Sequence, residues 1–444
     1  MTRITSMAAL AAAAVFVTAG AAYAVPSVTN VVMTQRANSR IVDITYELTG
    51  EAAIVTLGIE TNGIALPDSA VTRLSGDVCK AVATGANKSI VWDAGADWPE
   101  NLTQTAKAKV TAWSTNTPPL YMVVDVSGGA SATSYPVTYH VSAAALPEGG
   151  LTNDLYRTVR LVMRRVRTAV AGSQTENGVF MMGAPANETG RWDGRETYHQ
   201  VTLTNDFYMG VFGITQGQWQ QVMGDVRSLP GYWNNEAARM TRPIEQVSYY
   251  DIRENSANTD DAAVDWPNNS AVTAGSFMGR LRTRTGLLTF DLPTDAQREY
   301  ACRAGTTTAL NSGAVLTNTT TDASLNLLGR YRYDGGYMDG GATFPSQGCD
   351  ASNATAKVGS YQPNAWGLYD MHGNVWEWCL DWYIADLGSV AVVDPKGPAS
   401  GSARLFRGGC FDQAASSCRS ACRDSRGPND RYKCYGFRLV RTLP

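Results

Sequence analysis

The chain has 444 residues, of which 44% are hydrophobic and 17% charged, and its formal net charge is -3. This length suggests two or three domains, and the composition is that of a globular protein with a sizeable core. The near-neutral charge gives no electrostatic support for nucleic acid or an anionic membrane surface as a partner. Glycine is abundant, with 42 residues, which favours strands, turns and ordered loops over helical bundles.

The first 24 residues are typical of an export signal. Arg3 gives a positive start, residues 7–22 form an apolar and small-residue run, and Ala22-Tyr23-Ala24 is a small-x-small cleavage site. An N-terminal membrane anchor is the alternative, but the run is short and rich in alanine for a bilayer span. We therefore expect cleavage after residue 24, no membrane span in the mature chain, and export to the periplasm, the cell surface or the medium.

Eight cysteines fit an oxidising compartment. Cys79 stands alone in the first third of the chain, and the other seven lie in the C-terminal half. Because seven is odd, at least one thiol of that half is free or pairs with Cys79 or with another chain. The sequence leaves the pairing open.

Residues 25–115 show short runs rich in β-branched residues, separated by turn residues. The expected strands cover residues 28–32, 41–48, 53–59, 89–92 and 106–113. Regular strand spacing without helical periodicity predicts an all-β sandwich of immunoglobulin or fibronectin type. This part has no cluster of histidines, cysteines or paired acids, so we interpret it as a spacer or adhesion module.

Residues 116–177 are expected to form a β-rich connecting segment. Pro118-Pro119 interrupts the chain, and strands are expected over residues 121–126 and 135–141. Residues 156–166 interleave apolar and basic side chains. An anion-binding stripe is one interpretation of that pattern, and a strand with one solvated face is the favoured one.

A second domain is expected over residues 178–444, with short strands and short helices. Thr215 is a natural N-cap for a helix that carries Trp219 and Met223 on one face. Thr294 with Gln297 predicts a capping box at the start of another helix.

Other segments of the second domain are less regular. Residues 277–281 are expected to end a helix, and Asp295 with Glu299 to lie on a solvated helix face. Residues 304–357 are rich in Gly, Asn, Thr and Asp, and so long a loop needs its own stabilisation. A metal ion held by oxygen ligands and a mobile surface insertion are both open interpretations. The candidate ligands are Asn326, Asp334 and Asp350.

The stretch 367–382 contains three tryptophans together with a Gly-Asn turn and three acids, Asp370, Glu377 and Asp381. Trp376 and Trp378 are two residues apart, so in a strand they share one face while Glu377 points to the other. Large aromatic side chains at this density usually anchor a core. The stretch therefore predicts an aromatic core built beside an ion or ligand site.

An ordered set of motifs runs through the second domain. It comprises Met181-Met-Gly183, His199-Gln-Val-Thr202, Thr215-Gln-x-Gln-Trp219, Leu292-Pro-Thr-Asp-Ala-Gln-x-Glu-Tyr300, Gly367-Leu-Tyr-Asp-Met-His-Gly-Asn-Val-Trp-Glu-Trp378, Arg407-Gly-Gly, Arg419-Ser-Ala-x-Arg423 and Gly436-Phe-Arg-Leu-Val440. Together they resemble the formylglycine-generating enzyme (sulfatase-modifying factor) family. The resemblance implies an α+β fold, a variant of the C-type-lectin-like fold, low in regular secondary structure and often stabilised by calcium.

The resemblance also implies a chemistry and its cofactor. Enzymes of this family bind copper(I) through a Cys-x4-Cys pair after the Gly-Gly turn and, with oxygen, oxidise a sulfatase cysteine to formylglycine. Soft copper(I) prefers sulfur ligands. Counted from Gly408-Gly409, the two positions fall on Gln413 and Cys418; counted back from Arg419, Cys418 falls outside the pair. Neither count gives two cysteines, so the pair is absent. Cys410 and Cys418 are the candidate substitute pair, and structural disulfides or buried thiols are the favoured alternative.

By residue-to-residue match, the resemblance implies a calcium site at Asp370, Gly373, Val375 and Glu377. Hard calcium takes carboxylate and carbonyl oxygens, which such a turn can supply. A second calcium site would involve Asn326 and Leu327. The three histidines lie in separate segments, which does not favour a histidine-ligated iron site.

Two classes of function remain. The favoured one is an exported binding or accessory domain, stabilised by calcium, whose cleft holds a protein, peptide or glycan ligand and which needs no copper. The alternative is a formylglycine-generating oxidase. The missing Cys-x4-Cys pair favours the first class, and the family resemblance over the whole domain supports the second.

Overall fold

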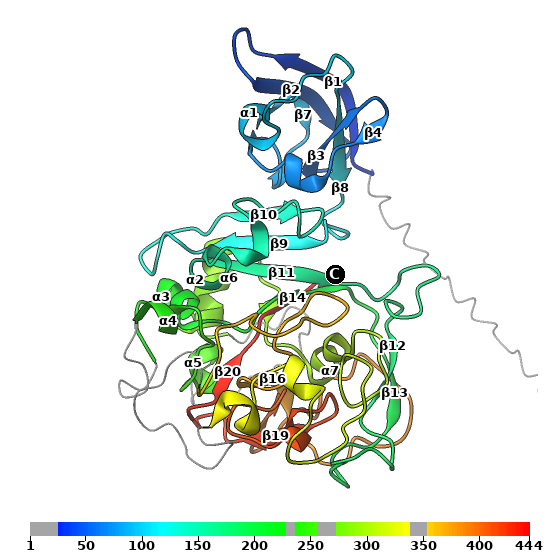
Figure 1. Cartoon of the computed structure of the whole chain (residues 1–444), viewed down its shortest axis with the longest axis vertical. Helices are drawn as coiled ribbons and strands as arrows, with labels where there is room; N and C mark the ends of the chain where they lie inside the picture. Colours follow the sequence, from blue (N-terminus) through cyan, green and yellow to red (C-terminus); the bar gives the residue numbers. More distant parts are fainter. Residues whose placement is uncertain (1–24, 228–235, 255–271, 338–352) are drawn as a thin grey trace, which may run out of the picture.

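The computed structural model describes residues 25–227, 236–254, 272–337 and 353–444. An N-terminal β module lies at one end of the molecule, and a larger domain with strands and short helices fills the rest (Figure 1). The predicted export signal, residues 1–24, lies outside the described residues, as do Cys349 and Asp350. Among the described helices, none has the length and apolar character needed to cross a bilayer.

The N-terminal module consists of two antiparallel sheets, with strand orders β1-β2-β7-β5 and β4-β3-β6, and β8 also pairs with β3. The elements are β1 Ser27–Gln35, β2 Ile41–Thr49, β3 Ala53–Thr61, β4 Ile64–Ala65, β5 Leu74–Gly76, β6 Ala81–Val82, β7 Gly85–Asp93, α1 Ala94–Asp97 and β8 Lys107–Trp113. Alternate residues of β2 are buried in a cluster that includes residues of β3 and β7. The expected strands are present, and their immunoglobulin or fibronectin type stays a prediction.

A six-stranded antiparallel sheet lies next to the N-terminal module, in the order β10-β9-β11-β14-β21-β15 (Figure 1). Its strands are β9 Tyr121–Asp125, β10 Val137–His140, β11 Arg160–Val166, β14 Phe207–Gly210, β15 Phe290–Asp291 and β21 Val440–Thr442. The segment 116–177, expected as a connector, thus supplies three strands of this sheet. Strand β11 has no fully exposed residue, and even Arg164 is buried, so the expected solvated face is wrong.

Two smaller sheets complete the larger domain. One contains β12 Val179–Met182, β13 His199–Thr202 and β17 Val392–Val393. The other contains β16 Trp376–Trp382, β18 Arg404–Arg407, β19 Arg423–Arg426 and β20 Tyr435–Phe437. Strand β16 lies inside this sheet, since it pairs antiparallel with β18 and parallel with β20.

The helices of the larger domain are short. They are α2 Leu155–Thr158, α3 Gln216–Met223, α4 Glu236–Met240, α5 Tyr249–Ile252, α6 Phe277–Thr285 and α7 Asp295–Arg303. Thr215 and Thr294 form the predicted caps, each as a full capping box. Phe277 begins α6 instead of lying near a helix end, because the Ser276 side chain accepts the amide N–H of Gly279.

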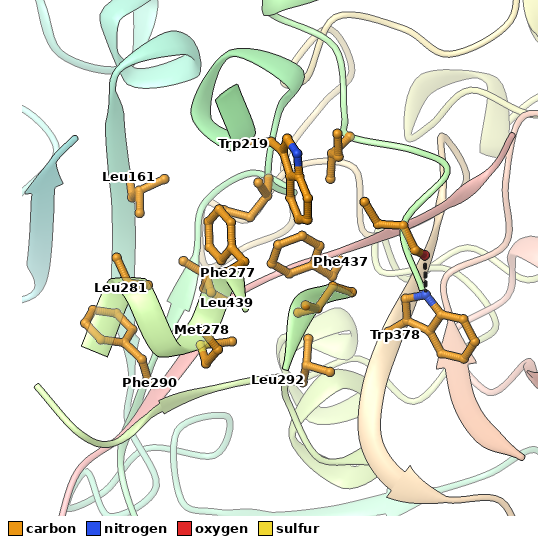
Figure 2. Packing of buried hydrophobic residues seen from close by; sticks show 14 of the residues in the cluster. Leu161, Trp219, Phe277, Met278, Leu281, Phe290, Leu292, Trp378, Phe437 and Leu439 are labelled. Carbon is orange, nitrogen blue, oxygen red and sulfur yellow. Dashed lines mark hydrogen bonds between the residues drawn. The ribbon is translucent and has the colours of Figure 1, made fainter. Parts of the chain in front are cut away.

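The main apolar core lies between helices α3 and α6 and strands β11, β16 and β20 (Figure 2). The rings of Trp219 and Phe277 stack with centroids 5.5 Å apart, and the Phe437 ring meets both edge-on. Trp378 closes one side of this core, where its indole N–H donates to the Val247 carbonyl at 3.0 Å. The Trp378 indole is therefore buried with its single hydrogen-bond donor paired.

Candidate functional site

Strand β16 carries the aromatic anchor predicted from the sequence. The rings of Trp376 and Trp378 lie 4.8 and 5.5 Å from the Phe406 ring of the neighbouring strand β18. Tyr435 of β20 packs against Trp378 and Phe406 from the other side. Because successive side chains of a strand alternate, Glu377 points away from this aromatic cluster. The alternation confirms the predicted placement of the two tryptophans and the acid.

Glu377 is held by two buried arginines. Arg298 of α7 donates to Glu377 Oε2 at 2.6 Å, and Arg438 donates to both carboxylate oxygens at 2.9 to 3.1 Å. All three side chains are at most 2% exposed. Burial raises the pKa of Glu377, but the two guanidinium charges outweigh burial and leave that pKa below its ordinary value.

This arrangement does not fit a calcium ion bound through Glu377, because both carboxylate oxygens already accept from cationic donors. Asp370 differs, since its Oδ2 accepts the Gly359 amide at 2.7 Å while its buried Oδ1 has no hydrogen-bond partner. Burial raises the pKa of Asp370 to about 6. Gly373 adopts a positive φ of 74°, and a side chain there would meet the Arg330 carbonyl. Calcium at Asp370, Gly373 and Val375 stays a prediction.

The residues of the second expected calcium site are occupied by protein hydrogen bonds. The Tyr331 hydroxyl donates to Asn326 Oδ1 at 2.6 Å, and the Gln362 amide donates to the Leu327 carbonyl at 2.9 Å. The Leu327 side chain is 55% exposed. Within the described ranges, no group of three or more His, Cys, Asp or Glu side chains could hold a metal. This second site also stays a prediction.

The loop after Gly409 places its cysteines in the interior. Gly409 has a φ of 74°, and a Cβ there would lie 2.6 Å from Cys418 Sγ, so the turn requires glycine. Cys410, Cys418 and Cys422 are at most 3% exposed. Burial raises the pKa of the Cys418 thiol well above its ordinary value, and that of Cys422 to about 12. Such thiols are poor nucleophiles at neutral pH.

Cys410 contacts a cysteine that the sequence did not single out. The two thiols interact electrostatically, and this interaction adds to burial in raising the pKa of Cys434, next to β20. The thiol of Cys418, the expected partner, is also close enough to Cys410 for the Cys410 thiol to add to burial in raising the pKa of Cys418. No disulfide joins the described cysteines. Cys410 therefore neighbours both Cys418 and Cys434, and Cys434 lies 24 positions away in the chain, a combination that no local spacing could reveal.

A cleft of about 440 Å³ opens beside this cysteine contact. We name it the Trp376 cleft. Its lining comprises Trp376, Phe406, Asp412, Gln413, Asp424, Arg426, Asp430, Arg431, Tyr432, Cys434 and Tyr435. Tyr432 is 44% exposed at its edge. The cleft thus combines aromatic rings with charges of both signs, and one position of the expected copper pair, Gln413, lines it.

His199 and His372 are buried core residues. The ring Nδ1 of each faces a backbone carbonyl, Thr197 at 2.8 Å and Cys418 at 2.6 Å respectively. The Asn311 amide donates to His372 Nε2, which also lies 3.9 Å from Cys302 Sγ. This buried thiol-imidazole contact was missed from the sequence, because its residues are 70 positions apart.

The expected solvated face of α7 is wrong. Asp295 and Glu299 are 3% and 0% exposed. Asp295 pairs with Arg407 and Arg423, and Glu299 pairs with Arg303 and Arg407. These guanidinium partners lie on strands β18 and β19 or one turn along the helix. Buried ion pairs thus join helix α7 to strands β18 and β19 in a domain with little regular secondary structure.

Comparison with known proteins supports the motifs found above. The family model described as "Sulfatase-modifying factor enzyme 1-like domain" matches residues 159–443, well over half of the chain. The chain belongs to this family. The match begins inside the segment expected as a connector, in agreement with the six-stranded sheet.

Curated relatives share part of this sulfatase-modifying factor domain. The chain is 36% identical to a formylglycine-generating enzyme of Thermomonospora curvata over 158 residues, which cover 34% of this chain and 48% of that enzyme. It is 32% identical to "Chaperone protein LppX" of Paenibacillus barcinonensis over 198 residues, covering 41% of this chain and 64% of that protein. The chain thus spans about half the length of the formylglycine-generating enzyme that it matches.

Solved structures give a weaker likeness. "Treponema denticola variable protein 1" has a TM-score of 0.44 and 26% identity, covering 64% of this chain and 96% of that one. PvdO from Pseudomonas aeruginosa has a TM-score of 0.43 and 22% identity, covering 64% and 95%.

Proposed function

We propose that this sulfatase-modifying factor domain is an exported binding domain that holds a peptide segment of a partner protein in the Trp376 cleft. The observation that carries the proposal is the lining of the cleft. Acids and arginines flank an aromatic floor there, so an extended peptide can place an apolar side chain against the rings and charged groups at either side. Aromatic residues and arginine are also the side chains that most often dominate binding energy.

The chemistry of the thiols supports binding over oxidation. An oxidase of the family type needs two accessible thiolates, whereas Cys418 and Cys434 are buried with pKa values above the ordinary thiol value. The N-terminal module then serves as a spacer that carries the binding domain. Calcium bound near Asp370 would be a structural addition to this proposal and is not required by it.

A selection with a random peptide library against the mature full-length chain tests the proposal. We expect selected peptides to lose affinity about tenfold or more when Tyr432 is replaced by alanine, because an exposed aromatic anchor contributes roughly 1–2 kcal/mol. Tyr198→Ala is the matched control, since Tyr198 is similarly exposed, at 37%, and does not line the cleft. Peptides that bind both variants equally, or binding only to glycans on an array, would contradict it.

One observation favours a second candidate, a formylglycine-generating oxidase. The contact of Cys410 with Cys434 beside the cleft offers two sulfur donors, the ligand type that copper(I) prefers. Both residues would hold the metal, which would supply oxygen activation when bound.

The two functions are separable by one assay. The chain is incubated with a Cys-x-Pro-x-Arg peptide, copper and oxygen, and the peptide is followed by mass spectrometry. We expect no conversion of the thiol to the aldehyde. Conversion that Cys434→Ser abolishes would establish the oxidase instead.

A further inference from the structure

A second cavity, of about 380 Å³, is lined by the start of helix α7, the end of strand β16, and residues of strands β12, β13 and β17. We name it the Asp381 cavity. Much of its wall is apolar and comes from Met182, Ile384, Leu387, Val392, Pro395 and Pro398. Asp381, at the end of β16, and Asp295, at the start of α7, add two carboxyl groups to this wall. The family match gives the Asp381 cavity no role, and the cavity is separate from the Trp376 cleft.

The two acids of the cavity differ in how they are paired. Asp295 has two cationic partners, because Arg407 donates to its Oδ1 and Arg423 lies 2.8 Å from its Oδ2. Asp381 is only 4% exposed, yet no ion pair is found for it in the described part of the chain. Its Oδ2 accepts the Asp295 amide N–H at 2.9 Å. For Oδ1 the described residues supply no hydrogen bond, and this oxygen lies against Gly397 on the cavity wall.

We propose that the Asp381 cavity binds a small organic cation, a primary ammonium group carried on an apolar body. Asp381 is a buried residue whose carboxylate has no cationic partner among the described residues, which is costly, and a bound ammonium group would supply a donor to Oδ1 and the missing charge. The apolar walls would bury the body of such a ligand, and the volume is that of a small-molecule site. This proposal is independent of what the Trp376 cleft binds.

Other ligand classes fit the cavity less well. A divalent metal ion needs several oxygen ligands, and here the Asp295 carboxylate already forms ion pairs with two guanidinium groups. An anion would be repelled by the Asp381 carboxylate, and the nearby arginines Arg407 and Arg423 already pair with Asp295. A neutral alcohol could accept or donate one hydrogen bond, but it would not neutralise the carboxylate.

Protonation of Asp381 gives the proposal a pH signature. Burial, together with the nearby Asp295 charge, raises the pKa of Asp381 to about 7. The charged and titratable groups around it are Asp295 on α7, Arg407 on β18, Arg423 on β19, His199 on β13, Cys379 on its own strand, and Asp386 with Lys396 on the cavity wall. Binding of a cation requires ionised Asp381, so it should release a proton below pH 7.

The probe is phenethylamine, measured by isothermal titration calorimetry on the mature full-length chain. We expect an affinity about tenfold higher at pH 8 than at pH 6, because the ionised fraction of a group of pKa near 7 changes by that factor. Near pH 6, titrations in buffers of different ionisation enthalpy should show close to one proton released. Phenethyl alcohol should bind more weakly than the amine at pH 8.

Two variants locate the site. Asp381→Asn should lose at least tenfold in amine affinity, whereas Asp193→Asn, at an exposed acid that does not line the cavity, should keep it. Leu387→Trp, which fills the cavity from its apolar wall, should also abolish binding and decides the matter if Asp381→Asn fails to fold. Equal affinity for amine and alcohol, or unchanged amine binding in both Asp381→Asn and Leu387→Trp, would overturn the proposal.

Discussion

Replacing Glu377 by glutamine tests whether the buried ion network stabilises the domain. The substitution keeps the shape of the side chain but removes the carboxylate that Arg298 and Arg438 share. Two guanidinium groups at most 2% exposed then lose their counter-charge. Breaking such a buried pair from one side costs roughly 3–5 kcal/mol. For a domain of this size that corresponds to a drop in Tm on the order of 10 °C.

Thermal unfolding followed by tryptophan fluorescence measures this change, because three tryptophans lie on β16 itself. Arg431→Gln is the matched control. It removes an arginine that is 40% exposed and pairs with Asp251, and should stay within about 1 kcal/mol of the native chain. A Glu377→Gln variant as stable as this control would refute the reasoning.

The same network has a defined pH dependence. The pKa of Glu377 in the folded chain lies below its ordinary value, so the folded state binds a proton there less readily than the unfolded state. The stabilisation is therefore complete above about pH 4.5 and is lost as the pH falls through the folded pKa. We expect this part of the acid sensitivity to disappear in Glu377→Gln.

Three further outcomes are expected. If Arg298 and Arg438 alone neutralise Glu377, chelation of divalent cations should change the Tm of the domain by less than about 2 °C. A larger decrease would establish the calcium predicted near Asp370. Cys418 and Cys422 should react with an alkylating reagent only as fast as the domain unfolds, measured by mass spectrometry of peptides, since both thiols are buried. Asp381→Asn should raise the Tm more at pH 8 than at pH 4, because a carboxyl whose folded pKa is raised from 3.8 to about 7 stabilises the fold below about pH 4 and loses that contribution as the pH rises to about 7.

Local signals in the sequence predicted local structure well. The caps at Thr215 and Thr294 are satisfied by residues three positions away, so the pattern contains its own partners. The alternation at Trp376 to Trp378 likewise depends only on strand geometry. The start of α6 could have been found in the same way, because Ser276 is a typical N-cap that was overlooked.

Long-range pairing explains the failures. Asp295 and Glu299 look like a solvated helical pair, but Arg407 reaches both from a strand more than a hundred residues later. Cys434 directly precedes β20, and the parallel pairing of β20 with β16 brings it near Cys410. Neither contact leaves a periodic trace in the sequence, so the candidate site could be located by family motifs but not assembled from them.

Strand β16 connects the three polar or functional features of the domain. Trp376, near its start, lines the Trp376 cleft, Glu377 anchors the arginines on the opposite face, and Asp381, near its end, reaches the second cavity. The strand is paired on both edges, and its pairing with β18 is irregular between Trp378 and Trp382. Such an irregularity re-aims side chains locally. In the two proposals, this one strand therefore presents an aromatic surface to a peptide at one end and, at the other, an acid without an ion pair among the described residues to a small cation, and neither proposed site depends on a catalytic thiol.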